Sequence, residues 1–190
     1  MILQLWLLGL NKTKKNVVKL IGGNWKRKNI FFHDSEGLRP TLGRVRETLF
    51  NWLNQDLTNK ACLDLFAGTG SLGFEALSRN ASSCIFVEKN KESFTELNKN
   101  KESLNADKAL ILHCPANIFL KRNAKKFDII FFDPPFMSKD DYELLDSLVY
   151  HLKPNGHIYM ESDSKYSGEI LKIIKSSIAG KVYFYLLSKS

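Results

Sequence analysis

Residues 62–77 read CLDLFAGTGSLGFEAL, and this stretch decides the fold. An apolar run of the strand type ends at Phe66, and Gly68, Gly70 and Gly73 follow in a G-x-G-x-x-G spacing that leads into a helix-like run. Glycine lets the backbone turn sharply and lets a ligand approach beside the N-terminus of a helix. The order of strand, glycine loop and helix therefore predicts a nucleoside site in preference to a ligand-free turn.

The same alternation continues to the C-terminus. Five apolar runs predict strands, at 61–66, 83–88, 109–114, 127–133 and 156–162. Four stretches between them predict helices, at 71–80, 91–105, 116–122 and 141–152. Continuous apolar strands that alternate with helices predict a parallel sheet covered on both faces. Two β-rich runs around Ala179-Gly180 predict an antiparallel hairpin that closes the sheet, although the first run, ILKIIKSSI, also fits a helix.

The composition predicts one domain with a small N-terminal appendage. The chain has 190 residues, of which 44% are hydrophobic and 25% charged, as in ordinary globular proteins. Its three cysteines and four histidines lack ligand spacing, so we expect free thiols and no metal. The apolar start MILQLWLLGL is too short for a membrane span, and its lysines follow it, unlike those of a signal peptide. We expect a cytoplasmic monomer.

Residues 16–40, before this alternation begins, have a different pattern. Two β-like runs flank Gly22-Gly23 and predict a small sheet or hairpin, and Thr41 is a plausible N-cap of the helix that follows. The net charge is +8, and six cations fall within residues 26–46 among aromatic residues: Lys26, Arg27, Lys28, Arg39, Arg44 and Arg46, beside Trp25, Phe31 and Phe32. This pattern suits phosphates and unstacked bases, and the alternative is a solvated basic face with partly paired arginines.

Two acids bear on which nucleoside the glycine loop would hold. Glu88 ends the next strand, twenty residues after Gly68, where a carboxylate can accept hydrogen bonds from both ribose hydroxyls. The glycine fingerprint alone fits a nicotinamide dinucleotide equally well. Asp64 lies within the preceding strand and can reach under the loop to an amino group, which favours S-adenosylmethionine (SAM). The alternative is that Asp64 only braces the loop through its amides.

Residues 129–137, IIFFDPPFM, end a buried-type run on Asp133 and two prolines. This position is the carboxyl end of a strand, where open α/β sheets bind ligands. An exocyclic base amine is a poor nucleophile, and Asp133 with the Pro134 carbonyl could accept its two hydrogens and expose its lone pair. Phe136 could stack on a flipped-out base. The alternative is an acid-initiated turn with a hydrophobic anchor.

These motifs resemble a known family. LDLFAGTGSLGFEALSR, FVE and FDIIFFDPPF resemble the SAM-dependent methyltransferases of exocyclic amines. LIGGNWKRKNI and LRPTLGRVRETLFNWL upstream, with IYMESD and AGKVYFYLLSK downstream, extend the resemblance to the bacterial 16S ribosomal RNA guanine-N2 methyltransferases, over residues 18–189. The D-P-P-F motif is shared with adenine and cytosine amine methyltransferases, so the arginine-rich upstream block carries the ribosomal RNA assignment.

The resemblance implies a Rossmann-like class I methyltransferase with a seven-stranded, mostly parallel sheet and an antiparallel C-terminal hairpin. It implies an extension at 1–15, an RNA-gripping β element and helix at 16–55, and a SAM-dependent domain at 56–190. The expected substrate is a guanine N2 amine in 16S ribosomal RNA or the small subunit. The expected SAM contacts are Asp64, Phe66, Gly68, Thr69, Gly70, Glu88, Lys89, Ala116, Asn117 and Asp133. The expected catalytic residues are Asp133, Pro134 and Phe136, and the expected RNA contacts are Lys26, Arg27, Lys28, Arg39, Thr41, Arg44 and Arg46.

One departure from the family concerns the adenine of the cofactor. Many relatives have Asp or Asn where this chain has Pro115, so adenine contact is expected from the backbone near Ala116 and Asn117 or from packing. Two other functions stay open: an adenine-N6 methyltransferase acting on DNA or RNA, and a non-catalytic RNA-binding module with this fold. An intact glycine loop together with an intact D-P-P-F motif argues against the second.

Overall fold

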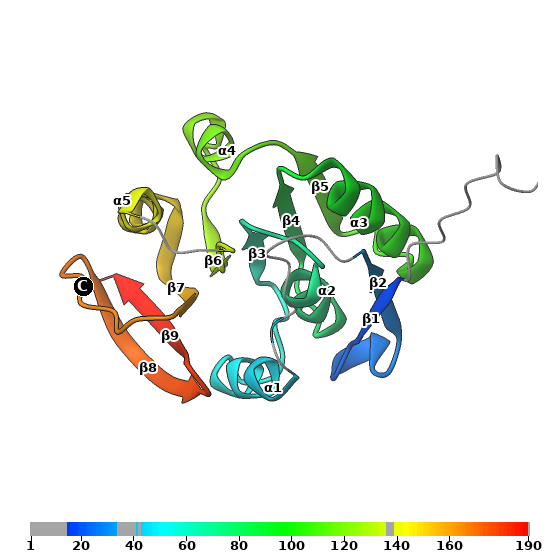
Figure 1. Cartoon of the computed structure of the whole chain (residues 1–190), viewed down its shortest axis with the longest axis horizontal. Coiled ribbons are helices and arrows are strands. Elements are labelled where there is room, and N and C mark those ends of the chain that lie inside the picture. The colour runs from blue at the N-terminus through cyan, green and yellow to red at the C-terminus, as the bar shows by residue number, and fades with distance from the viewer. Residues whose placement is uncertain (1–14, 34–40, 42, 136–138, 190) are drawn as a thin grey trace, which may run out of the picture.

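A seven-stranded sheet organises the molecule (Figure 1). The computed structural model describes residues 15–33, 41, 43–135 and 139–189. The strands are β3 (Ala61–Asp64), β4 (Ser83–Glu88), β5 (Ala109–His113), β6 (Phe127–Phe132), β7 (Leu152–Ser162), β8 (Leu171–Ala179) and β9 (Val182–Lys189). They lie in the order β5-β4-β3-β6-β7-β9-β8, with the first five parallel and β9 antiparallel to both neighbours. This confirms the predicted fold class, and the ambiguous run ILKIIKSSI is the edge strand β8.

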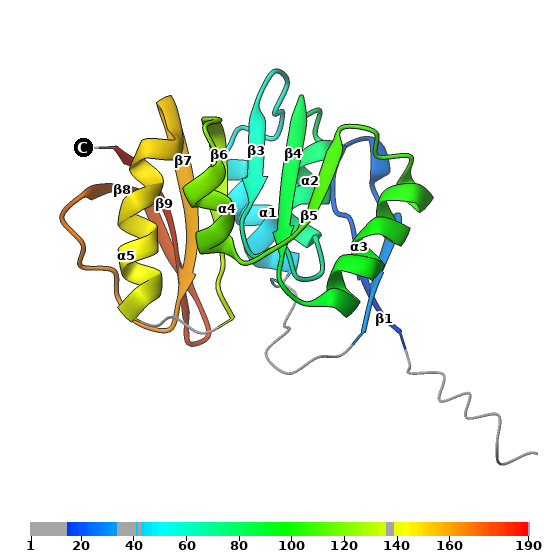
Figure 2. The same ribbon diagram turned by 90° about the horizontal axis from the view of Figure 1, so that it is seen from above.

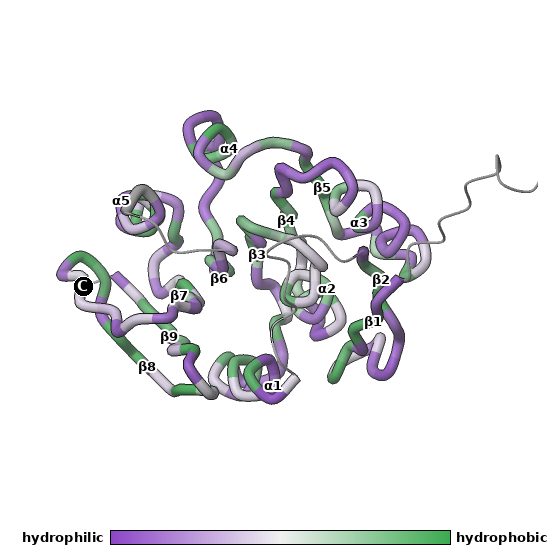
Figure 3. Tube along the Cα trace, viewed as in Figure 1, coloured by the Kyte–Doolittle hydropathy of each residue, from purple (hydrophilic) through white to green (hydrophobic). Residues whose placement is uncertain are grey.

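Helices cover both faces of the sheet, because both faces of a parallel sheet are apolar. The first face is covered by α1 (Gly43–Trp52), α2 (Ser71–Ser78) and α3 (Lys91–Leu104), and the second by α4 (Ala116–Arg122) and α5 (Lys139–Ser147). Alternate residues of one strand enter different cores: Cys62 packs on the first side and Leu63 on the second. Most residues of α3 are hydrophilic, as the purple stretches of its tube show (Figure 3).

The connection into β7 differs from the predicted one. The expected helix at 141–152 stops at Ser147, a 3-10 turn η2 (Leu148–His151) follows, and β7 begins at Leu152. Leu152 pairs with Phe127, but the register then shifts so that Ile129 pairs with His157. Pro154 lacks an N–H and Asn155 has a φ of 61°, so the segment between the two pairs leaves the regular ladder.

The N-terminal residues form a separate two-stranded antiparallel sheet, β1 (Asn16–Lys19) and β2 (Asn29–Phe32), joined through the 3-10 turn η1 (Gly23–Trp25). This confirms the predicted β element. The amide of Trp25 donates to Ser78 Oγ at the end of α2 (2.9 Å), and Ser78 Oγ donates to the carbonyl of Gly22 (2.6 Å). Asn100 of α3 bonds both backbone groups of Phe31, at 2.9 and 2.8 Å. The element is therefore fastened to two helices of the main sheet.

Two opposite sides of the sheet matter for function: the edge where the parallel strands end and the edge where they begin (Figure 2). The glycine loop follows the carboxyl end of β3 and leads into α2, whereas the β1–β2 turn bonds the other end of α2. Since α2 has eight residues, the two places lie about 12 Å apart along its axis. Among the described residues, no helix is long and apolar enough to cross a membrane.

Candidate active site

The glycine loop has the backbone that its sequence predicts. Gly68 and Gly70 have φ values of 50° and 77°, in the left-handed region that favours glycine. The amide of Gly70 closes a tight turn onto the carbonyl of Ala67 at 2.6 Å. A Cβ on Gly70 would lie 2.6 Å from Leu97 and 2.7 Å from Phe74, so this position also requires glycine for packing. A Cβ on Gly73 would lie 2.3 Å from the Phe86 ring, so the third glycine lets α2 pack against β4.

The acid inside β3 braces this loop. Asp64 is buried, and its Oδ2 accepts the amide of Gly73 at 3.0 Å. Burial raises the pKa of Asp64 to about 8, with a further rise from the charge of Glu88, although the Gly73 bond opposes the shift. The structure therefore shows the contact that the sequence offered as an alternative role for Asp64, in which it braces the glycine loop. Within the described part of the chain, no donor bonds the other carboxylate oxygen, Oδ1, which keeps its acceptor capacity for an amino group.

Glu88 stands at the end of β4, as the sequence predicts. Its Oε2 accepts the amide of Gly68 at 2.8 Å, and its Oε1 accepts the amide of Asn90 at 2.6 Å. Each carboxylate oxygen has two lone pairs, so acceptor capacity remains for two hydroxyls. Glu88 thus connects the glycine loop to the start of α3. The next residue, Lys89, is exposed, and its carbonyl lies 3.1 Å from His113 Nε2.

The remaining predicted cofactor contacts surround this edge. Phe66 is half-buried, and its ring meets that of Phe132 edge-on with centroids 5.3 Å apart. Thr69 is buried, and its Oγ1 accepts the amide of Ser71 at 3.2 Å, so its side chain serves the start of α2. We therefore expect a ligand to contact its backbone.

The start of α4 lies beyond β5. Pro115 occupies the N-cap position of this helix and forms no side-chain cap. Ala116 is half-buried, whereas Asn117 is exposed and its Oδ1 accepts the amide of Ile118 at 2.8 Å. Oδ1 of Asn117 is thus engaged locally, and the backbone of this turn stays the expected contact for an adenine.

Asp133 follows β6 directly, at the same edge as the glycine loop, because β6 is the neighbour of β3 in the sheet. The side chain is half-buried and its Oδ2 lies 3.4 Å from the Thr41 hydroxyl, which donates to it. Burial raises the pKa of Asp133 well above its ordinary value, and the charges of Glu161 and Asp64 raise it further. Pro134 is buried beside it, and Phe136 lies outside the described residues.

Sequence reasoning missed a second acid at this place. Glu161 lies near the carboxyl end of β7, and the hydroxyl of Tyr159 donates to its Oε1 at 2.7 Å. Burial raises the pKa of Glu161, whereas bonds from Tyr159 and Thr41 oppose the rise. The available signal was the acid in IYMES, which ends the strand after the one that carries Asp133.

Two of the predicted RNA contacts have other partners. Arg46 is only 4% exposed, and its Nη2 donates to the Lys19 carbonyl at 3.0 Å. Burial lowers its pKa, and the charge of Glu75 opposes that shift. A buried guanidinium cannot reach a phosphate, so its predicted RNA contact is corrected to a contact with β1. Thr41 is buried, and its hydroxyl bonds Asp133 rather than lying on the basic surface.

The other cations divide between the surface and the undescribed part of the chain. Lys26, Arg27 and Lys28 are exposed in the β1–β2 turn, and Arg44 is exposed in the first turn of α1. Trp25 beside them is half-buried, and Phe31 is 37% exposed, whereas Phe32 is buried in the core. Arg39 lies outside the described residues. The basic turn therefore lies at the sheet edge opposite to Asp133 (Figure 2).

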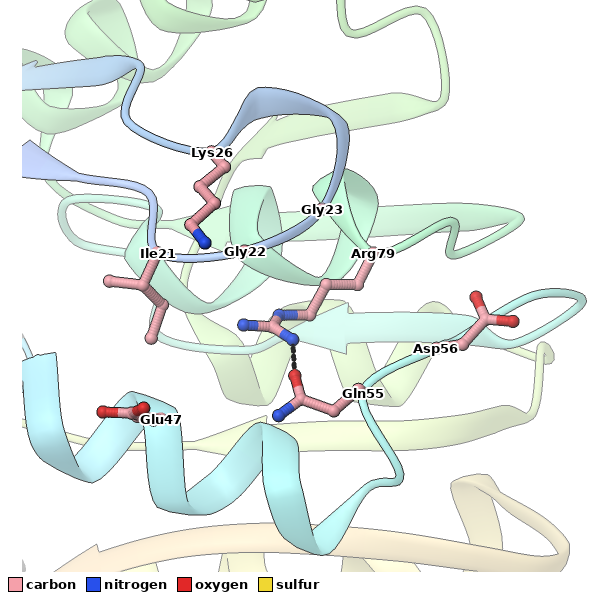
Figure 4. A pocket seen from close by; sticks show the side chains of 8 residues that line it. All are labelled: Ile21, Gly22, Gly23, Lys26, Glu47, Gln55, Asp56 and Arg79. Atoms are coloured by element: carbon pink, nitrogen blue, oxygen red, sulfur yellow. Dashed lines mark hydrogen bonds between the residues drawn. The ribbon is translucent and has the colours of Figure 1, made fainter.

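A groove of about 610 Å³ lies beneath this turn, between α1 and the end of α2 (Figure 4). Lys26 and Arg79 point into it, Glu47 lies across from Lys26 on α1, and Asp56 lies at the side. Arg79 already bonds Gln55 and Glu75. The positive and negative side chains balance, and the groove is separated from the glycine loop by the length of α2, so it is not the cofactor site.

Comparison with known proteins agrees with this geometry. The sequence profile of the family described as "Conserved hypothetical protein 95" matches residues 18–188. Ribosomal RNA small subunit methyltransferase D of Haemophilus influenzae is 42% identical over 155 residues, which cover 78% of this chain and 80% of that protein. The protein of the same name from Escherichia coli K12 is 39% identical over 159 residues, covering 80% and 78%.

Solved structures show the same relation. A structure described as a putative methyltransferase from Escherichia coli has a TM-score of 0.82 and 34% identity, covering 92% of this chain and 98% of its own. One described as a putative methylase from Haemophilus influenzae has a TM-score of 0.75 and 34% identity, covering 90% and 98%. Together with the match over residues 18–188, these relatives show that the chain belongs to the ribosomal RNA small subunit methyltransferase D family.

Proposed function

We propose that this chain transfers a methyl group from SAM to the exocyclic N2 amine of a guanine in the 16S RNA of the small ribosomal subunit. The observation that carries the proposal is the position of Asp133, an acid with spare acceptor capacity on the strand beside the glycine loop. The names of the relatives support ribosomal RNA of the small subunit as the substrate, and the base and its atom are the finer part of the proposal.

The residues at this edge fit the cofactor. The backbone of the 66–70 loop, held by Gly68 and Gly70 in left-handed conformations, leaves room for close approach, and Glu88 keeps acceptors for the ribose hydroxyls. Asp64, below the loop, would bind the amino group, and the backbone from Ala116 would contact the adenine. When bound, SAM supplies an electrophilic methyl group.

Asp133 and its prolines would prepare the nucleophile. The Asp133 carboxylate accepts one hydrogen of the amine and the Pro134 carbonyl accepts the other, so the nitrogen lone pair is directed away from the ring. Methyl transfer would break the sulfur–methyl bond of SAM and release S-adenosylhomocysteine, and the amine would lose one proton, which Asp133 is proposed to accept. Burial raises its pKa, which makes its carboxylate a stronger base than an exposed aspartate. Phe136 is proposed to stack on the base.

The RNA phosphates would be bound far from the reacting atoms. Lys26, Arg27, Lys28 and Arg44 are the exposed cations of the N-terminal element, and phosphate contacts there would orient the RNA without touching the reacting atoms. Because the β1–β2 turn lies at the opposite edge from Asp133, the bound RNA must extend along the face of the N-terminal element to use both.

The test is to incubate the protein with labelled SAM and with small subunits or 16S RNA from cells that lack this modification, then to identify the labelled nucleoside. N2-methylguanosine is the expected product. N6-methyladenosine would support the alternative amine methyltransferase, and the absence of any labelled nucleoside from both substrates would favour a non-catalytic RNA-binding module.

A further inference from the structure

Two acids, rather than one, face the place where the base amine would lie. Parallel pairing joins Phe131 of β6 to Tyr159 of β7, and Phe132 to Met160, so Asp133 and Glu161 are the next pair along the two strands. Side chains alternate between faces, so both acids lie on the face of Phe131 and Tyr159, whose ring centroids are 6.5 Å apart. Neighbouring strands are about 4.8 Å apart, which places the two carboxyls side by side.

These carboxyls have few donors in the protein. The Thr41 hydroxyl donates to Asp133 at 3.4 Å, and the Tyr159 hydroxyl donates to Glu161 at 2.7 Å. Within the described parts of the chain, neither acid forms a salt bridge. Two carboxylates can accept far more hydrogen bonds than two hydroxyls supply. Both side chains are half-buried rather than sealed, so a ligand that brings several N–H groups could reach them.

Guanine brings such groups in the required order. Its Watson–Crick edge places the N1–H donor directly beside the N2 amine, which gives three hydrogens on two nitrogens that share the carbon C2. Adenine and cytosine instead present a ring nitrogen lone pair beside their amine, and a lone pair facing a carboxylate is repelled. A site with one acid accepts any of these amines, whereas a site with two adjacent acids favours guanine.

We propose that Glu161 is the specificity-determining residue for the base: its carboxylate accepts the N1–H of the target guanine while Asp133 accepts a hydrogen of the N2 amine. This inference rests on the proposed function, since it presumes that the methyl acceptor is a guanine amine. Tyr159 bonds Glu161, and Thr41 bonds both carboxyls, so the two hydroxyls position the acids and leave the remaining oxygen lone pairs to the base.

The inference is tested with a base that keeps the N2 amine but lacks the N1 hydrogen. In 2-aminopurine the N2 amine remains, but N1 carries a lone pair in place of the hydrogen, and the O6 oxygen is absent. The target guanine is first mapped with the parent protein. The 16S RNA is then assembled from fragments with either guanine or 2-aminopurine at that position, and kcat/KM is measured on both with labelled SAM.

The variants are Glu161→Gln and Glu161→Ala, with Glu169→Gln as the matched control, because Glu169 is an exposed acid beyond the end of β7. Both Glu161 variants should lose about ten- to a hundredfold in kcat/KM on guanine, the scale of a hydrogen bond to a charged group. The preference for guanine over 2-aminopurine should fall by a similar factor in Glu161→Gln, since its amide can donate to the N1 lone pair. Glu169→Gln should keep both values of the parent.

The preference is a ratio within one protein, so it does not depend on how much of a variant is folded. If the parent produces N2-methylguanosine and the ratio is unchanged in both Glu161 variants, the role of Glu161 is overturned while the proposed function stands. If the parent methylates another base, the proposed function fails, and the guanine contact of Glu161 fails with it.

Discussion

Two groups of acids in this molecule, one fully buried and one half-buried, have opposite surroundings. Glu75 on α2 is fully buried, and its oxygens accept the Ile21 amide at 2.8 Å and the Arg79 Nε at 2.9 Å. Asp133 and Glu161 at the carboxyl edge of the sheet receive hydroxyl donors, and the pKa of each is raised by burial. A paired acid holds two elements together, whereas acids with spare acceptors and raised pKa values are typical of sites that bind or react.

The paired acid should matter mainly for stability. Glu75→Ala removes the acceptor of a buried guanidinium at the end of the same helix and of the Ile21 amide, which fastens α2 to the N-terminal element. We expect the free energy of unfolding to fall by about 3–5 kcal/mol, as when one partner of a buried ion pair is removed. Urea unfolding measures it. Glu47→Ala is the control, an exposed acid of α1 that should change stability by about 0.5 kcal/mol or less.

A decrease of less than about 1 kcal/mol in Glu75→Ala would mean that the pairing of this acid contributes little, and the contrast with the carboxyl edge would disappear.

The edge acid should matter mainly for chemistry. Asp133→Ala should lower the rate of methyl transfer about a hundredfold or more, because the variant lacks the proposed proton acceptor and amine anchor. Unfolding in urea should show no loss of stability, since the change removes a buried acid whose ionisation is unfavourable. Single-turnover transfer from labelled SAM measures the rate, and SAM titration should show that most of the cofactor affinity remains.

Glu143→Ala is the control for Asp133, because Glu143 is an exposed acid on α5. Its rate and stability should match those of the parent. If Asp133→Ala transferred methyl groups at nearly the parent rate, Asp133 would be a turn residue and the contrast between the two groups of acids would fail.

The two groups also differ in how far the sequence could predict them. Asp133 stands in a local motif, and the glycine spacing and strand alternation that surround it are local as well, so the fold class and the acid were predictable. Arg46 looked like one more surface cation, and its burial arises from a contact with Lys19, 27 residues earlier. Helical spacing shows which residues share a helix face, but it does not show what that face packs against.

Thr41 and Glu161 show the same limit at the active site. Thr41 bonds Asp133, which is 92 residues later, and Glu161 joins them only because β7 lies beside β6 in the sheet order. The order of strands in a parallel sheet is set by crossovers, which a single sequence does not specify. The register shift near Asn155 was missed for a related reason, since it depends on the pairing of β7 with β6.

The exposed cations of the β1–β2 turn differ from both groups of acids, because they lie in solvent. Reversal of Lys26, Arg27 and Lys28 to glutamate should weaken RNA binding about tenfold or more and leave SAM affinity unchanged, because these residues would contact phosphate only. The slope of log affinity against log salt should become shallower by about 0.7–0.9 for each phosphate contact that the reversal removes. Binding of 16S RNA or small subunits is measured at several salt concentrations.

The control for this turn reverses Lys172, Lys175 and Lys181, three exposed lysines in the β8–β9 hairpin, and changes the net charge by the same amount. It should keep nearly the parent slope. Equal slopes and affinities in the parent and the Lys26, Arg27 and Lys28 variant would mean that RNA binds elsewhere on the molecule.

The smallest expected effect concerns the hydroxyl that reaches Asp133. Thr41→Val removes this donor and keeps the shape of the side chain. A contact of 3.4 Å is long for an O–H···O bond, so the rate at pH 7 should fall only about two- to tenfold. The Thr41 bond lowers the pKa of Asp133, so its removal raises that pKa further.

Because Asp133 must be ionised to accept the amine proton, a higher pKa leaves less of the active carboxylate at neutral pH. The rise of the single-turnover rate with pH should therefore move to higher pH in Thr41→Val, and the rate should approach that of the parent under alkaline conditions. Thr41→Ser keeps the hydroxyl and should keep the parent profile. A uniform decrease in rate at every pH in Thr41→Val would show that Thr41 affects packing, not the ionisation of Asp133.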